Sequence, residues 1–302
     1  MRTFVVGTRG SALALWQTRW VSLLTHRAIT ERIITTRGDL DQSSKLQGKL
    51  EKGFFTEELE AALYAKEIDW AVHSLKDLPT RQPDGLVLGA IVERASPADL
   101  LLVRNEYVDE SRAFPVKPGA RVGTCSLRRE AMLRHVAPEA VATPLRGNVP
   151  TRLTKLRDHL YDAIVLAEAG VRRLQLDLTG LAVFRLDPRR WPPAPGQGAV
   201  AVQCRADDEE VRAVLRGLHH VPTAHAVEIE REFLRTLEGG CTTPFGCYVD
   251  GQRAWLGQLH GDTWREKTTP VPLATPGPEW FSAELASFPR QESSHEPLFT
   301  RV

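Results

Sequence analysis

Two short segments far apart in the chain carry the residues best suited to chemistry. Lys76 and Asp77 stand in His-Ser-Leu-Lys-Asp-Leu-Pro, where a predicted strand gives way to a loop and an aspartate can lie in a cleft. Cys241 follows Gly239-Gly240 and precedes Thr-Thr-Pro, which favours an accessible thiol that acts as a nucleophile or as an attachment point. A carboxylate and a thiol in such positions suggest chemistry on a molecule tethered to the protein.

Several arginines between these segments fall at the ends of predicted strands or in the first turns of helices. They are Arg128, Arg129, Arg146, Arg152 and Arg173. Guanidinium groups bind carboxylates bidentately, and helix N-termini add backbone N–H donors. Any one of them could be a solvated surface arginine, but their placement at one end of a sheet favours a shared polyanionic ligand.

The same residues also have simpler interpretations. Asp77 could be a turn aspartate before Leu78-Pro79, and Cys241 could be a buried free thiol, although its glycines favour exposure. Three histidines, His219, His220 and His225, raise the possibility of a metal site. No second cluster completes a ligand set, so we expect no metal.

Composition places the chain among ordinary globular proteins. Its 302 residues predict two or three domains, and 42% hydrophobic with 25% charged residues is typical of a soluble protein. The net charge is +1 without a local basic excess, so we expect no nucleic-acid partner. Four scattered cysteines without a CxxC pair, no signal-peptide pattern and no long apolar run predict a cytoplasmic protein that does not span a membrane.

Short apolar strands alternate with amphipathic helices over the first two thirds of the chain, which predicts mostly parallel sheets covered by helices. Helices are expected from 11 to about 26 and around Phe55, Leu59 and Leu63. Strands are expected at 4–7, 32–36, 70–74, 100–103, 121–123, 141–144, 163–167 and 199–204. We therefore expect an α/β fold with two hinged domains, 1–93 plus 194–217 and 97–191, and a ligand cleft between them.

The remainder of the chain has a different pattern. Thr223 is expected to cap a helix that Gly239-Gly240 ends and whose buried face carries Ala226, Ile229, Phe233 and Leu237. Short strands such as 254–257, a proline-rich loop over 268–278 and a short helix around Phe281, Leu285 and Phe288 should follow. This predicts a smaller α+β domain, 221–302, with Cys241 on a loop.

Six segments in collinear order resemble the porphobilinogen deaminase family, also called hydroxymethylbilane synthases. They are 4–16, 52–79, 123–129, 145–148, 195–199 and 238–241. Each is a weak motif alone, but six in the right order are specific. The resemblance runs from the first strand to about Asp250 and is thin beyond it.

The resemblance implies a cytoplasmic, monomeric, three-domain enzyme of tetrapyrrole and heme biosynthesis, with two hinged α/β domains like those of periplasmic binding proteins. Such a transferase joins four porphobilinogen molecules head to tail into hydroxymethylbilane and releases ammonia. The family builds its product on one covalent dipyrromethane cofactor per chain. By motif, the thioether falls on Cys241 and the catalytic aspartate on Asp77.

Further site residues follow by motif from the same resemblance. Cofactor contacts are implied for Lys76, Ser126, Arg128, Arg129, Arg146, Gly147 and Gln197, and substrate contacts for Arg9, Ser11, Arg152 and Arg173. The chemistry agrees, because a carboxylate such as Asp77 can stabilise the azafulvene cation left when porphobilinogen loses ammonia. Each added pyrrole brings two carboxylates, which arginines suit.

Some positions depart from the family pattern. Pro150 stands where related sequences tend to have glycine and could shift Arg152, and Cys247 lies near enough to Cys241 to complicate thiol chemistry. Glu57-Glu58 stands where many relatives carry a lysine, so no basic contact is assigned there.

Two other functions fit parts of the pattern. A hinged pair of α/β domains also describes a non-enzymatic anion-binding receptor, but such a receptor needs no cysteine on a third domain and usually carries an export signal. A non-catalytic paralogue is disfavoured by the presence of both Asp77 and Cys241.

Overall fold

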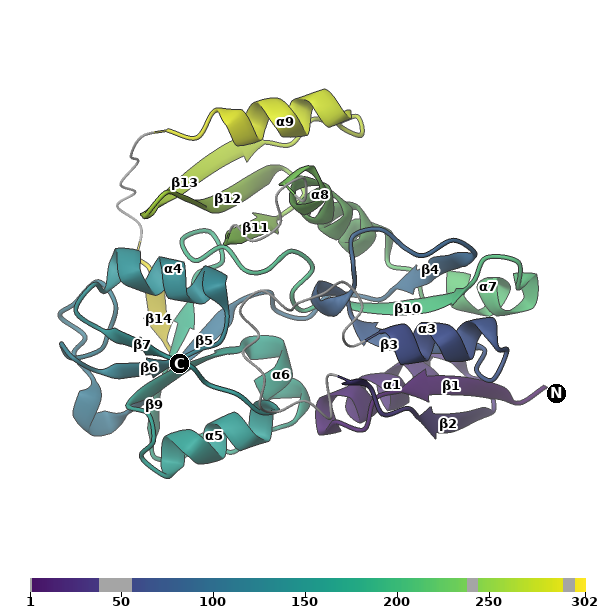
Figure 1. Cartoon of the computed structure of the whole chain (residues 1–302), viewed down its shortest axis with the longest axis horizontal. Helices are drawn as coiled ribbons and strands as arrows, with labels where there is room; N and C mark the ends of the chain where they lie inside the picture. Colours follow the sequence, from purple (N-terminus) through teal and green to yellow (C-terminus); the bar gives the residue numbers. More distant parts are fainter. Residues whose placement is uncertain (1, 38–55, 238–243, 290–296) are drawn as a thin grey trace. The chain divides into compact units, whose positions relative to one another are not determined.

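The computed structural model describes residues 2–37, 56–237, 244–289 and 297–302. Contacts divide the chain into two units, Met1–Ala95 with Gly198–Val227, and Ser96–Gln197 with Glu228–Val302 (Figure 1). The division into three domains, the hinge and the cleft stay predictions.

A five-stranded sheet in the order β2-β1-β3-β10-β4 forms the first unit. Its strands are β1 (Phe4–Thr8), β2 (Ile29–Ile33), β3 (Trp70–Ser74), β4 (Leu86–Ile91) and β10 (Val200–Arg205). β1, β2 and β3 are parallel, and β10 is antiparallel to both its neighbours. The strand expected at 32–36 was misplaced, because β2 is a largely exposed edge strand whose polar residues hide it from a hydrophobicity pattern.

Helices α1 (Ala12–Thr25), α3 (Glu57–Tyr64) and α7 (Glu209–Arg216) cover this sheet. The alternating side chains of β3 pack on both faces, since Trp70 and Val72 share a core with α1 and α7 while Ala71 packs with α3. Ser11 caps α1 by accepting from Ala14 N at 3.3 Å, and His26 ends it with φ 50°.

The second unit is built on a six-stranded sheet in the order β14-β9-β5-β8-β6-β7. Its strands are β5 (Asp99–Arg104), β6 (Arg121–Gly123), β7 (Val141–Thr143), β8 (Ala163–Ala167), β9 (Leu181–Leu186) and β14 (Phe299–Arg301). Helices α4 (Leu127–Val136) and α5 (Val149–Arg157) lie on opposite faces, and α6 (Glu168–Arg173) follows β8 (Figure 1). Leu101 and Val103 pack on the α4 face, and Leu100 and Leu102 on the α5 face.

An antiparallel sheet, β11 (Phe245–Val249), β12 (Arg253–His260) and β13 (Thr263–Pro270), accompanies α8 (Val221–Leu237) and α9 (Pro278–Ala286). Phe233 of α8 contacts Trp280 and Phe281 of α9 with ring centroids 5.2 and 4.8 Å apart. Ala226, Ile229 and Phe233 are buried as expected, whereas Leu237 is only partly buried.

Two expectations for this part were wrong in detail, and a third lies outside the described residues. Thr223 is not the cap, because α8 already begins at Val221. The backbone N–H of Thr223 donates to His220 Nδ1 at 3.3 Å, and the Thr223 hydroxyl accepts a bond from Arg94 N instead of from the helix. The loop expected at 268–278 begins later, since β13 pairs with β12 as far as Pro270. The third expectation, that the helix ends at Gly239-Gly240, lies outside the described residues.

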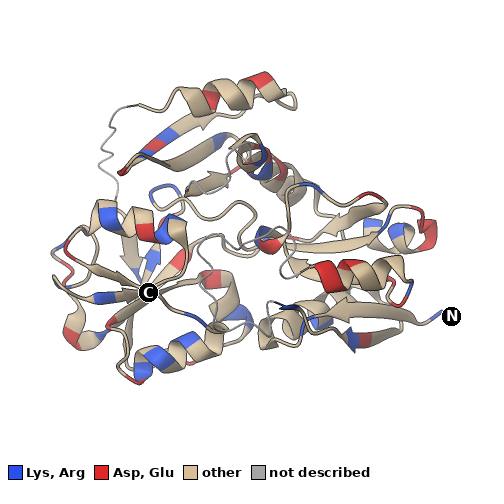
Figure 2. Ribbon diagram, viewed as in Figure 1, with Lys and Arg blue, Asp and Glu red and all other residues tan. Residues whose placement is uncertain are grey.

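The α/β class expected from the sequence is confirmed. The expectation of mostly parallel sheets was wrong, because β10 is antiparallel to β3 and β4, and β5 is antiparallel to β8 and β9. Basic and acidic residues are interspersed along the elements (Figure 2). Over the described ranges, no helix is both long and apolar enough to cross a membrane.

Candidate active site

The Asp77 turn directly follows β3. Leu75–Asp77 is a single 3-10 turn, fixed by a bond from Leu75 N to Ala199 O at 3.0 Å and by Leu78 N to Leu75 O at 3.2 Å. Leu75 and Leu78 are buried in one cluster, whereas Lys76 and Asp77 are exposed. The two leucines therefore anchor the turn and leave the predicted catalytic carboxylate at the surface.

A pocket within the first unit joins this turn to the start of α1. Its lining residues are Arg9, Ser11, Leu13, Ala14, Gln17, Thr56, Val72, His73, Ser74 and Asp77. β1 and β3 are parallel neighbours, so the residues that follow them meet at one edge of the sheet. The empty space is about 450 Å³, counting the part open to solvent. The structure thus brings Arg9, Ser11 and Asp77 together.

His73 is a pocket residue that the sequence analysis did not single out. Only 6% of it is exposed, and its Nε2 has no hydrogen-bond partner. Burial lowers the pKa of His73 to about 4, with a further contribution from Arg9, so the imidazole is neutral at neutral pH. Thr56 Oγ1 is likewise buried without a partner. A histidine that directly follows three apolar residues in the strand Trp70–Ser74 was the available signal.

Most of the predicted cofactor and substrate residues of the second unit follow three neighbouring strands. β7 and β8 both pair with β6 in parallel, so the segments after these strands share one edge of the sheet. Ser126 after β6 caps α4 by accepting from Arg129 N, and Arg146 and Gly147 follow β7. Arg173, after β8, is 9% exposed, and burial lowers its pKa to about 10.

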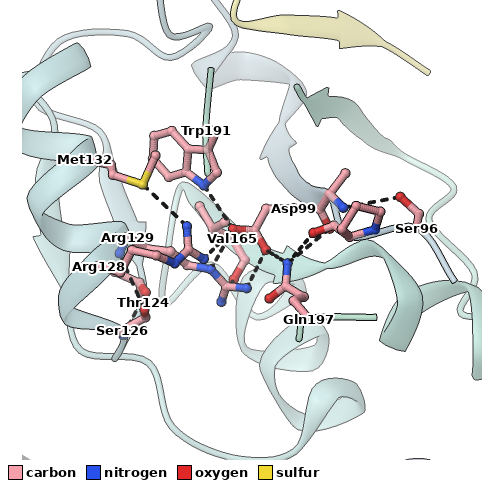
Figure 3. A network of polar contacts seen from close by, with 12 residues as sticks. Ser96, Asp99, Thr124, Ser126, Arg128, Arg129, Met132, Val165, Trp191 and Gln197 are labelled. Carbon is pink, nitrogen blue, oxygen red and sulfur yellow. Dashed lines mark hydrogen bonds and ion pairs between the residues drawn. The ribbon is translucent and has the colours of Figure 1, made fainter. Parts of the chain in front are cut away.

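Arg128 and Arg129 contact a buried aspartate, Asp99, that the sequence analysis missed (Figure 3). Arg129 Nη2 and Nε donate to the two Asp99 carboxylate oxygens at 2.6 and 3.0 Å, and Arg128 Nη2 donates at 2.9 Å. Trp191 Nε1 and Gln197 Nε2 add bonds of 2.9 and 2.8 Å. A single carboxylate at the start of an apolar strand was its only sequence signal.

Charge keeps Asp99 ionised despite its complete burial. Burial alone would raise the pKa of Asp99, but the charges of Arg129 and Arg128 hold it well below its usual range. The same burial lowers the pKa of Arg128, which Asp99 partly offsets. Two guanidinium groups and one carboxylate leave this cluster with one net positive charge.

The turn before α5 accommodates the family departure at Pro150. Asn148 caps the helix by accepting from Thr151 N at 2.9 Å, and Pro150 lies in the first turn, where a missing N–H costs nothing. Gly147 has φ 112°, and a Cβ there would lie 2.8 Å from a methyl carbon of Thr151. Arg152 Nε donates to the Gly147 carbonyl at 2.7 Å.

The predicted attachment residue, Cys241, lies outside the described residues. Cys247, the nearest other thiol in the sequence, is fully buried in β11, and its N–H donates to Pro193 O at 2.8 Å. Cys125 is partly exposed, whereas Cys204 is buried and burial raises its pKa to about 11. Cys247 and Cys204 are therefore poor attachment points as they stand.

A second buried carboxylate, Glu230 of α8, holds the loop that carries Gln197. It accepts from Gly196 N at 2.8 Å and from Val249 N of β11 at 3.0 Å. Within the part of the chain that the structure covers, no group of histidine, cysteine and acidic residues could hold a metal ion.

Comparison with known proteins identifies the family. The family model "Porphobilinogen deaminase, dipyromethane cofactor binding domain" matches residues 4–213, and "Porphobilinogen deaminase, C-terminal domain" matches 224–259. The porphobilinogen deaminase of Synechococcus elongatus is 41% identical over 284 residues, covering 87% of this chain and 88% of its own. That of Desulforudis audaxviator is 47% identical over 253 residues, with 81% and 79% covered.

Among solved structures, the periplasmic VFT2 domain of Bordetella pertussis BvgS is 14% identical, with a TM-score of 0.41 over 72% of this chain and 86% of its own. The family models and the curated relatives, which span most of the sequence, decide the assignment. The chain belongs to the porphobilinogen deaminase family.

Proposed function

We propose that this chain is an active porphobilinogen deaminase that joins four porphobilinogen molecules into hydroxymethylbilane and releases ammonia. The observation that carries the proposal is the exposed Asp77 in one pocket with Arg9 and Ser11. Family membership favours this enzyme over a non-enzymatic anion-binding receptor. We further propose that it acts as a cytoplasmic monomer, without nucleic-acid or membrane partners.

Each pocket residue has a role that its chemistry supports. The Asp77 carboxylate accepts a hydrogen bond from the pyrrole N–H and stabilises positive charge as ammonia leaves. Arg9, and Ser11 at the start of α1, bind a substrate carboxylate, which suits a guanidinium and a helix N-terminus. Neutral His73 lines the same pocket and adds no competing charge.

The second unit fits a cofactor that bears carboxylates. The cluster around Arg128 and Arg129 keeps one net positive charge, and Arg128 Nε is buried without a partner. With Ser126, Arg146, Gly147 and Gln197, these residues would hold the dipyrromethane, and Lys76 and Cys241 complete the proposed set. When bound, the dipyrromethane supplies the pyrrole carbon to which substrate is joined. Arg152 and Arg173 are proposed for substrate carboxylates.

The intact mass of the denatured protein tests the attachment. The wild type should exceed its sequence mass by two linked porphobilinogen units, and Cys241→Ser should lack this excess. A Cys241→Ser protein that keeps the excess would move the attachment to another residue.

Turnover of porphobilinogen tests the role of Asp77. Asp77→Asn should keep the wild-type circular dichroism spectrum and lose nearly all turnover, because an amide cannot stabilise the developing cation. Asp84→Asn, which changes an exposed aspartate in the same unit, is the matched control and should turn over normally. Normal turnover by Asp77→Asn would exclude Asp77 from the mechanism.

A further inference from the structure

Asp99 connects residues from separate parts of the second unit. Its carboxylate accepts from Arg128 and Arg129 in the first turn of α4, and from Trp191 and Gln197, which follow Asp99 by 92 and 98 residues (Figure 3). None of Asp99 is exposed to solvent. Three of its four donor residues are those proposed to contact the cofactor, so their relative positions depend on one buried group.

The two arginines need this counter-charge. Arg128 and Arg129 are 5% and 6% exposed, and their guanidinium groups bond to the same carboxylate. Without it, two buried like charges would repel one another, and the penalty of an uncompensated buried charge is large. Pro192 O and Val165 O accept one further bond each, at 2.8 and 3.1 Å, but carry no charge.

The remaining bonding capacity points toward a ligand. The cluster keeps one net positive charge, and the Arg128 Nε–H is buried with no partner. A fixed surplus of one charge next to an unused donor matches one carboxylate of a ligand. Asp99 thereby limits the surplus to one charge while it orients both arginines.

We propose that Asp99 is a positioning residue for the cofactor: it holds Arg128, Arg129 and Gln197 as one unit with a single net positive charge. The inference rests on the proposed function. Asp99 touches neither substrate nor reacting atoms and acts through the side chains that it binds.

Asp162 offers a matched control in the same unit. It directly precedes β8, whereas Asp99 pairs with Ala167 at the end of that strand. Asp162 is 3% exposed and forms ion pairs with two arginines. Its Oδ1 lies 2.9 Å from Arg121 Nη2 and 3.7 Å from Arg104 Nη1. These arginines are not proposed site residues. Asp162→Asn therefore removes a buried carboxylate from an ion pair with a half-exposed arginine and leaves the cofactor cluster intact.

Cofactor loading and steady-state kinetics of Asp99→Asn and Asp162→Asn test the inference. Both variants should lower the thermal midpoint, but only Asp99→Asn should lower the fraction of chains with the covalent mass excess. In its loaded fraction, kcat should fall about tenfold to a hundredfold through misplacement of the bound groups, while KM, which depends on the proposed substrate residues Arg9, Ser11, Arg152 and Arg173, changes little. Loading and kcat like those of Asp162→Asn would overturn the inference.

A milder variant covers the case in which Asp99→Asn does not fold. Trp191→Phe removes one donor to Asp99 and keeps a ring against Phe114, whose centroid is 5.6 Å from that of Trp191. We expect the kcat of Trp191→Phe to be several-fold below that of wild type, with KM unchanged. If Trp191→Phe had the cofactor loading and kcat of wild type, the inference would again be overturned. Failure of the proposed function is distinguishable, because then the wild type itself would lack the mass excess and turnover.

Discussion

Replacing Glu230 with glutamine should destabilise the second unit, because this carboxylate joins three of its segments. It lies on α8 and accepts from Gly196 N in the loop before Gln197 and from Val249 N on β11. A glutamine has the same shape but only one acceptor oxygen, so one buried N–H would face the amide NH₂. Losing one charge-assisted bond and leaving its donor unsatisfied should cost about 2–4 kcal/mol of unfolding free energy.

Urea denaturation followed by tryptophan fluorescence measures this effect. Glu228→Gln is the matched control, because Glu228 is an exposed residue on the same helix, and its unfolding free energy should stay within about 0.5 kcal/mol of wild type. Equal midpoints and slopes for Glu230→Gln and Glu228→Gln would refute the argument that Glu230 joins the segments.

Two further predictions concern stability. His73 titrates near 4 when folded and near 6.5 when unfolded, so the unfolded chain binds more protons between these values and stability falls as the pH falls. Wild type should lose about 2 kcal/mol between pH 7 and pH 5 from this group, and urea titrations of His73→Gln should show a correspondingly shallower pH dependence; an unchanged slope would contradict the assignment. Gly246→Ala places a Cβ 2.3 Å from Pro192 O, so it should lower the thermal midpoint by several degrees. Gly277→Ala, with nothing within 4 Å, should not, and equal midpoints for the two variants would show that β11 moves freely away from Pro192.

The hydrophobic pattern of the sequence predicted those strands and helices that are buried in the fold. β3 and β8 are buried apolar runs and lie where they were expected, as does the buried face of α8. β2 was misplaced because an exposed edge strand has no hydrophobic signature. Thr223 was assigned as a cap because local sequence does not show that its hydroxyl bonds to Arg94 N instead.

The order of short motifs and the local hydrophobic pattern were enough to predict the α/β class, the family and a set of candidate site residues, because both depend only on nearby residues. Which groups those side chains touch depends on packing between distant segments and is seen only in the folded chain. It brought Arg9 and Asp77 to one pocket, since β1 and β3 are neighbours in the sheet although their last residues, Thr8 and Ser74, are 66 positions apart. It also bonded Arg128 and Arg129 to a buried aspartate, because a buried cation requires a counter-charge that only the packed chain can supply.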